Sequence, residues 1–328
     1  MKRYWVLGLV VFFFLTCARK VPGKGNVYIL LQNVKGVDLY DPSKDSLYTG
    51  ILSTGVTPNY LLFGEDKGYI VNSGFGGTPS LQIFNVENNE LVAIYPLPQG
   101  SNPYAAALVG KEIYVTSYTF NKLYILNEEG TIADSLPVGR SPEGIIADNN
   151  KIYVACANVT YDTAGYPVYN DAYLYIIEGK NVKDSIKVGK NCQWVEKDED
   201  NIVVLSTGDY GMTQAGRLYI VQNEQLKDSI EVGGAPGYFV VKDKKAYIVG
   251  WADSLKIVDL TSKNIRKIGL DTLGGYMGCD IDDEGKIFVV QGDWIGQNNT
   301  LIVIENETIT KRIPLGNATG ASFVRVKE

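Results

Sequence analysis

The feature that most constrains the fold is a short motif that returns along the chain at near-regular intervals. In each full copy a glycine opens a turn and a proline follows three residues later. These copies occupy residues 55–58, 100–103, 139–142 and 233–236. A variant at 189–192 ends in cysteine, a weaker copy lies at 316–319, and the missing copy belongs in the degenerate stretch 269–275. A period of about 40–50 residues is typical of repeat architectures built from one supersecondary unit.

The segments between these turns follow a constant order. Short runs of β-branched and aromatic residues, bounded by glycine, asparagine or acidic turns, predict strands. Second strands are expected at 69–71, 113–116, 152–154 and 247–249, third strands at 81–84, 123–126, 174–177, 218–221 and 301–304, and polar fourth strands at 134–136, 184–186 and 228–230. No stretch after residue 16 shows the periodicity of an amphipathic helix. The pattern predicts an all-β protein, a β-propeller with four antiparallel strands per blade.

The two ends of the repeat region complement each other. Residues 27–30, 37–40 and 47–50 match the second, third and fourth strands of a unit, whereas 321–326 matches only a first strand. We therefore expect one blade to be split between the termini (a 1+3 closure), giving a seven-bladed β-propeller. Such closure pairs the end of the chain with its beginning and removes open sheet edges. A linear solenoid with capped ends is the alternative, but it does not explain why the half-units are complementary.

Two segments place the repeats within a known family. Residues 113–117 (IYVTS) and 136–145 (LPVGRSPEGI) closely resemble the YVTN repeat of YncE-like seven-bladed propellers. The resemblance covers nearly all of residues 26–328 and implies the fold, but its motifs are structural and assign no catalytic residue. Some YncE-like surface lipoproteins bind vitamin cofactors and others carry protein contacts, so both functions remain open. The asparagine of the motif survives only as Asn72, and its place is taken by Ser117, Cys156, Ser206, Gly250 and Gln291.

The N-terminus resembles an export signal. Lys2 and Arg3 precede an almost unbroken apolar run over residues 4–15. As a helix this run would span about 18 Å, too short for a hydrocarbon core of about 30 Å. A basic start followed by a short apolar stretch is typical of a secretory signal peptide.

Cys17 follows the apolar run and resembles the lipidated cysteine of a bacterial lipobox. Phe14 and Thr16 depart from the leucine and small residue usual at those positions. We expect localisation to the cell envelope on the periplasmic or cell-surface side, with membrane attachment only through this lipid; the alternative is secretion without lipidation. The expected domains are a signal peptide at 1–16, the lipidated cysteine and a tether at 17–25, and the propeller at 26–328.

Composition excludes several kinds of site. The chain contains no histidine, so a His-based triad and a histidine-ligated metal are excluded. Its formal net charge of −6 argues against nucleic acid as a partner. Cys156, Cys192 and Cys279 remain after the signal peptide, without a C-x-x-C motif, and pairing among them is left open. We expect no cofactor and no metal.

Aromatic residues concentrate where a propeller builds its binding face. Connections between blades and those between second and third strands open on the same face, and loops on a rigid scaffold often carry function. Tyrosine and tryptophan there offer apolar contact with a polar tip. The candidate ligand-binding residues near the glycine turns are Tyr60, Tyr104, Trp194, Tyr238 and Tyr276, and those in the extended loops are Tyr161, Tyr166, Tyr169, Tyr210, Trp251 and Trp294.

These residues favour a non-enzymatic protein that binds a small molecule, a glycan or a protein partner through this aromatic loop face. One alternative is a metal-dependent propeller hydrolase or lactonase, for which Glu143, Asp171 and Asp293 are the candidate carboxylates. Another is a scaffold subunit of an envelope complex. The acidic pairs at 198–200 and 282–284 are interpreted as solvated turns between first and second strands.

Overall fold

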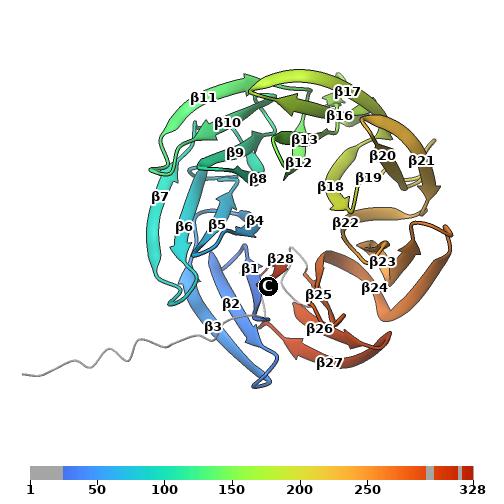
Figure 1. Ribbon diagram of the computed structural model, residues 1–328. Coiled ribbons are helices and arrows are strands. Elements are labelled where there is room, and N and C mark those ends of the chain that lie inside the picture. The colour runs from blue at the N-terminus through green and yellow to red at the C-terminus, as the bar shows by residue number, and fades with distance from the viewer. Residues whose placement is uncertain (1–24, 293–298, 317–319, 328) are drawn as a thin grey trace, which may run out of the picture.

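Every regular element in the described part of the chain is a β-strand. The computed structural model describes residues 25–292, 299–316 and 320–327. No helix occurs among these residues, as the sequence predicts. The strands form antiparallel sheets that stand around a central axis, with the first strand of each sheet near the axis and the last at the rim (Figure 1). This arrangement is a β-propeller.

Five sheets contain four strands each. The first is formed by β28 (Ala321–Val326), β1 (Val27–Leu31), β2 (Gly36–Asp41) and β3 (Ser46–Ser53). The second sheet is formed by β4 (Pro58–Phe63), β5 (Lys67–Asn72), β6 (Ser80–Asn85) and β7 (Leu91–Pro96). The third is formed by β8 (Pro103–Val109), β9 (Glu112–Ser117), β10 (Lys122–Leu126) and β11 (Ile132–Pro137). The fourth sheet is formed by β12 (Pro142–Asp148), β13 (Lys151–Cys156), β16 (Asp171–Glu178) and β17 (Asn181–Lys190). The fifth is formed by β18 (Cys192–Asp198), β19 (Asn201–Ser206), β20 (Arg217–Gln222) and β21 (Gln225–Glu231).

The degenerate copy of the repeat is a continuous strand and not a turn. A six-stranded sheet contains β22 (Ala235–Lys242), β23 (Lys245–Asp259), β24 (Ile265–Ile281), β25 (Ile287–Gln291), β26 (Thr300–Glu305) and β27 (Thr308–Pro314). β24 runs without interruption through residues 269–275. Its first part pairs with β23 and its last part with β25, so this one strand joins two repeat units.

Burial explains the composition of the strands. β1 and β2 are buried along their whole length, because neighbouring sheets cover both of their faces. Strands covered on both faces are expected to be largely apolar. β2 departs from this at Asp38 and Asp41, which are buried and accept hydrogen bonds from the backbone amides of Gly50 and Ser43. The outer strand β7 is mostly exposed and has no such cover. The polar fourth strands predicted from the sequence therefore correspond to the rim of the wheel.

The C-terminal strand completes the sheet of the N-terminal strands. β28 pairs antiparallel with β1, with Phe323 opposite Leu30 and Arg325 opposite Tyr28. Phe323 and Tyr28 thus lie in one sheet, as the sequence predicts. The pairing satisfies backbone groups of β1 that would otherwise form a free edge. It also places Phe323 and Arg325 near the central axis, where the candidate site lies.

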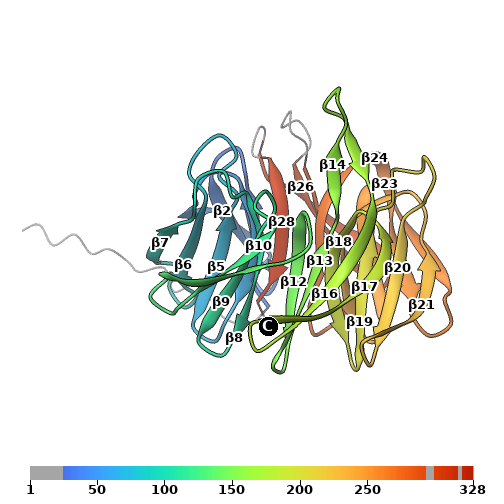
Figure 2. The same cartoon turned by 90° about the horizontal axis from the view of Figure 1, so that it is seen from above.

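One predicted loop contains a small sheet of its own. β14 (Val159–Tyr161) and β15 (Pro167–Tyr169) form a two-stranded hairpin within the long connection between β13 and β16. Figure 2 shows this hairpin projecting from one face of the wheel.

The N-terminal predictions lie outside the described residues: these are the signal peptide at 1–16 and the lipidated Cys17. In the described ranges no helix is long and apolar enough to cross a membrane. Cys156, Cys192 and Cys279 are buried free thiols.

Candidate functional site

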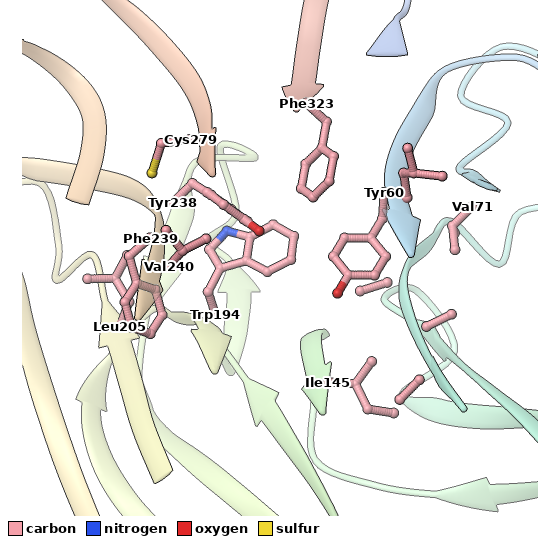
Figure 3. Close-up of a cluster of buried hydrophobic side chains, with 14 of the residues drawn as sticks. Tyr60, Val71, Ile145, Trp194, Leu205, Tyr238, Phe239, Val240, Cys279 and Phe323 are labelled. Carbon is pink, nitrogen blue, oxygen red and sulfur yellow. The ribbon is translucent and has the colours of Figure 1, made fainter. Parts of the chain in front are cut away.

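Four aromatic rings meet on the central axis. Tyr60, Trp194, Tyr238 and Phe323 come from β4, β18, β22 and β28, and Figure 3 shows them pointing toward one another. Trp194 stacks on Tyr60 with ring centroids 5.8 Å apart and meets Tyr238 edge-on at 4.8 Å. Phe323 lies 5.1 Å from Tyr60 and 5.2 Å from Tyr238. We call these four residues the floor cluster; aromatic pairs at such distances attract each other beyond simple area burial.

A cation holds the floor cluster in place. The Arg325 guanidinium donates hydrogen bonds to the hydroxyl oxygens of Tyr238 (3.1 Å) and Tyr60 (3.4 Å). It also lies 5.6 Å from the centre of the Tyr60 ring, within the range of a cation–π contact. Burial raises the pKa of Tyr60, and the charge of Arg325 lowers it only in part. Burial raises the pKa of Tyr238 as well, so both hydroxyls stay protonated at neutral pH.

A cavity of about 570 Å³ opens above this floor, and we call it the funnel. Its lining comes from the starts of inner strands and from the connections that follow second strands, which meet on one face as the sequence predicts. None of the described residues that line it is charged. Its aromatic lining residues are Phe75, Tyr104, Trp194, Tyr210, Trp251, Tyr276 and Phe323.

The rim of the funnel differs from its base in exposure. Trp251 on β23 is 65% exposed, Tyr210 is 56% exposed and Phe75 is 82% exposed. Trp194 and Tyr276, by contrast, are buried. Large apolar side chains that face solvent beside a buried aromatic base form a typical ligand pocket. The funnel can therefore cover a ligand at its rim while the base keeps its shape.

Glu143 lies behind the base of the funnel. It belongs to β12 and is only 3% exposed, and its Oε2 atom has no hydrogen-bond partner among the described residues. Burial raises the pKa of Glu143 to about 8, and hydrogen bonds to the side chains of Tyr104 and Gln193 lower it in part. Both partners line the funnel. Glu143 is therefore a protonated, uncharged acid at neutral pH.

The structure divides the residues singled out from the sequence into three groups. The first lines the funnel and comprises Tyr104, Trp194, Tyr210, Trp251 and Tyr276. Tyr60 and Tyr238 do not line it and lie in the floor cluster, where they pack against other rings.

Tyr161, Tyr166 and Tyr169 form the third group and lie on or beside the hairpin β14–β15. Tyr169 meets Tyr210 edge-on at 5.5 Å, which puts the hairpin next to the funnel, while Tyr161 and Tyr166 are exposed. Trp294 lies outside the described residues.

The carboxylates considered for an enzyme do not lie together in the described part of the chain. Glu143 is buried, whereas Asp171 is half exposed and pairs with Lys187 at 2.6 Å. Asp293 lies outside the described residues. Asp282 accepts hydrogen bonds from the backbone of Glu284 and Lys286 in its own turn. In the described ranges no group of three or more Cys, Asp or Glu side chains is placed to hold a metal ion.

Sequence reasoning missed several lining residues. Phe75 lies between Gly74 and Gly76, and a single phenylalanine between glycines carries little signal. Asn102 lies within the glycine turn 100–103 and Gln193 directly follows the turn 189–192, so the recurring turn could have marked both. Phe323 reaches the funnel only because β28 is an inner strand.

Comparison with known proteins supports the fold alone. No protein-family model matches the chain, and no curated protein matches it. Hydrazine synthase from Kuenenia stuttgartiensis is 13% identical, with 81% of this chain and 88% of that chain covered and a TM-score of 0.68.

Two further solved structures are similar. A quinonprotein alcohol dehydrogenase-like protein from Bacteroides thetaiotaomicron VPI-5482 is 12% identical, covering 93% of this chain and 79% of that chain with a TM-score of 0.68. A functionally unknown protein from Desulfotomaculum acetoxidans DSM 771 is 10% identical, covering 92% and 98% with a TM-score of 0.67. At these identities the likeness shows the β-propeller fold and no activity.

Proposed function

We propose that this protein is a non-enzymatic binding protein of the cell envelope and that its funnel takes the ligand. The observation that carries the proposal is the cavity of about 570 Å³ above a closely packed aromatic floor. Its size lies within the range of about 300–1,000 Å³ common for small-molecule pockets. Because the floor is already packed, a ligand would bind without first ordering the site, which favours affinity.

The lining supports binding over catalysis. Its described residues offer aromatic faces, amides and hydroxyls, and none of them is an acid, a lysine or an arginine. General acid–base chemistry needs a titratable group within reach of the substrate. The carboxyl group of Glu143 lies behind Tyr104 and is almost fully buried, so it is not part of the lining.

We further propose a seven-bladed wheel. In this arrangement the five four-stranded sheets are five blades, and the six-stranded sheet supplies two blades because β23 and β24 each change partner along their length. The pairing of β28 with β1 supports a blade shared between the termini. The YVTN-repeat resemblance agrees with the same count.

The envelope location rests on Cys17 and is a separate part of the proposal. Cys17 becomes the lipidated first residue, and residues 17–25 link it to the propeller. Labelling of cells with a palmitate analogue tests this, because the label should be lost when Cys17 is replaced by serine. Equal labelling of both proteins would contradict the lipid anchor.

Ligand screening tests the funnel. The mature chain is titrated with cofactors, glycans and peptides while its tryptophan fluorescence is recorded, since Trp194 and Trp251 both line the cavity. Trp251→Ala should weaken the binding of a hit about three- to tenfold. Phe120→Ala removes an exposed ring outside the funnel lining and serves as the matched control. A hit that binds both variants equally would place the binding site elsewhere.

A protein partner is the second candidate ligand, favoured by the hairpin β14–β15. Tyr161 and Tyr166 are 63% and 69% exposed there. Exposed tyrosines on a projecting element are typical of protein contacts. A photo-crosslinker placed at position 166 should then capture a specific protein in cells, and a crosslinker at position 120 should not.

A further inference from the structure

The uncharged lining of the funnel limits the chemical class of ligand that can bind there. This inference rests on the proposed function. Charged residues make up 21% of the chain, yet none of the described lining residues carries a charge. A charged group that entered would give up water without meeting an opposite charge, which is unfavourable. The funnel therefore disfavours ions.

Amide and hydroxyl side chains lie among the aromatic rings of the funnel. Asn102 supplies an amide group and Ser73 a hydroxyl group to this lining. Gln32 reaches Asn59 only over a long hydrogen bond of 3.4 Å. Such groups both donate and accept hydrogen bonds, so they can be satisfied by hydroxyl groups of a ligand.

Two ionisable side chains lie behind the funnel. The charge of Arg325, next to Phe323, is balanced by Asp280 at 3.8 Å, and the second group is the acid Glu143. Glu143 is 3% exposed and sits next to Tyr104 and Gln193, both of which line the cavity. Burial keeps its carboxyl group protonated at neutral pH. It therefore adds no negative field that would attract a cation.

We propose that the funnel binds a short, neutral saccharide. A sugar ring presents C–H groups on its faces, which pack on tryptophan and tyrosine, and hydroxyl groups at its edge, which pair with amides. Trp251 at the rim and Trp194 at the base offer aromatic surfaces at two depths, and Asn102 offers hydrogen bonds. A cavity of about 570 Å³ suits a short oligosaccharide rather than a folded partner.

Isothermal titration calorimetry of the full mature chain tests the inference. The neutral probes are maltotetraose, cellotetraose, xylotetraose and N-acetylated chitotetraose, and oligogalacturonate is the charged comparison. At least one neutral probe should bind, with an affinity that hardly changes between about 50 mM and about 1 M sodium chloride, because no ion pair is formed. Trp251→Ala and Asn102→Ala should each weaken it about three- to tenfold. Phe120→Ala should leave it unchanged.

The outcomes separate the ligand class from the site. If no neutral probe binds at millimolar concentration, or if the two funnel variants bind it as tightly as the unaltered protein, the saccharide inference is wrong. If only oligogalacturonate or a flat aromatic cofactor binds, and the funnel variants weaken that binding, the inference is wrong while the proposed function stands. Should either alanine variant fail to fold by thermal unfolding, Trp251→Phe and Asn102→Ser replace it, with a smaller loss of affinity expected for each.

Discussion

Replacing Glu143 with glutamine should stabilise the protein, and the gain should grow as the pH rises. Burial raises the pKa of this carboxyl group from 4.5 to about 8. Between these two values the unfolded chain carries an ionised Glu143, whereas the folded protein keeps it protonated. The folded state then binds more protons, so the free energy of unfolding falls as the pH increases. This loss of stability is absent below the pKa that Glu143 has in the unfolded chain, and it is complete above the pKa that Glu143 has in the folded protein.

The size of the effect follows from the shift. Each pH unit within the window lowers the free energy of unfolding by about 1.4 kcal/mol. From 4.5 to neutral pH the loss amounts to about 3 kcal/mol, and Glu143 is buried enough that solvent does not screen it. Glutamine has nearly the same shape and does not ionise. The variant should therefore match the unaltered protein near pH 4.5 and exceed it by about 3 kcal/mol at pH 7.

Guanidinium unfolding followed by tryptophan fluorescence, at about pH 5 and about pH 8, measures this difference. Glu65→Gln is the control, because Glu65 lies exposed in a turn and is not part of the core. A Glu143→Gln gain of the same size at both pH values would refute the reasoning, since it would mean that ionisation of Glu143 in the folded protein carries no penalty.

Other changes probe the axis and the funnel. Trp194→Ala should lower the free energy of unfolding by about 3–5 kcal/mol in denaturant titrations, because it removes a buried ring from the floor cluster. Deleting residues 321–328 should abolish cooperative thermal unfolding and cause aggregation in size-exclusion chromatography, since it exposes the edge of β1. Gly144→Ala should cost about 1–3 kcal/mol by calorimetry, as its Cβ would lie 2.7 Å from the Gln193 carbonyl oxygen. Replacing residues 160–168 with two glycines should leave the melting temperature nearly unchanged, because the hairpin is largely exposed.

Much of the candidate site could be predicted from the sequence. Tyr104 and Trp194 follow glycine turns at the starts of inner strands, so their position near the axis follows from the repeat. Tyr276 holds the like place after the degenerate copy, although that copy is part of the continuous strand β24. Tyr210 and Trp251 follow second strands, which places them on the same face. Periodicity sufficed here because it sets where along a blade each residue lies.

The depth of each ring could not be predicted in the same way. Tyr60 and Trp194 hold like positions after their turns, yet only Trp194 reaches the funnel. Tyr60 does not line the cavity, and the Arg325 side chain from the other end of the chain donates a hydrogen bond to its hydroxyl oxygen. That contact joins residues 265 positions apart, and no local pattern encodes it.

The strand order, the repeat period and the complementary ends can be predicted from the sequence, because strand propensity and turn chemistry act over a few neighbouring residues. The folded arrangement is needed to show which rings fill the axis, which rings line the funnel, and that Glu143 is a buried neutral acid. These properties depend on side chains from different sheets competing for one narrow space, and their outcome is set by packing across the axis.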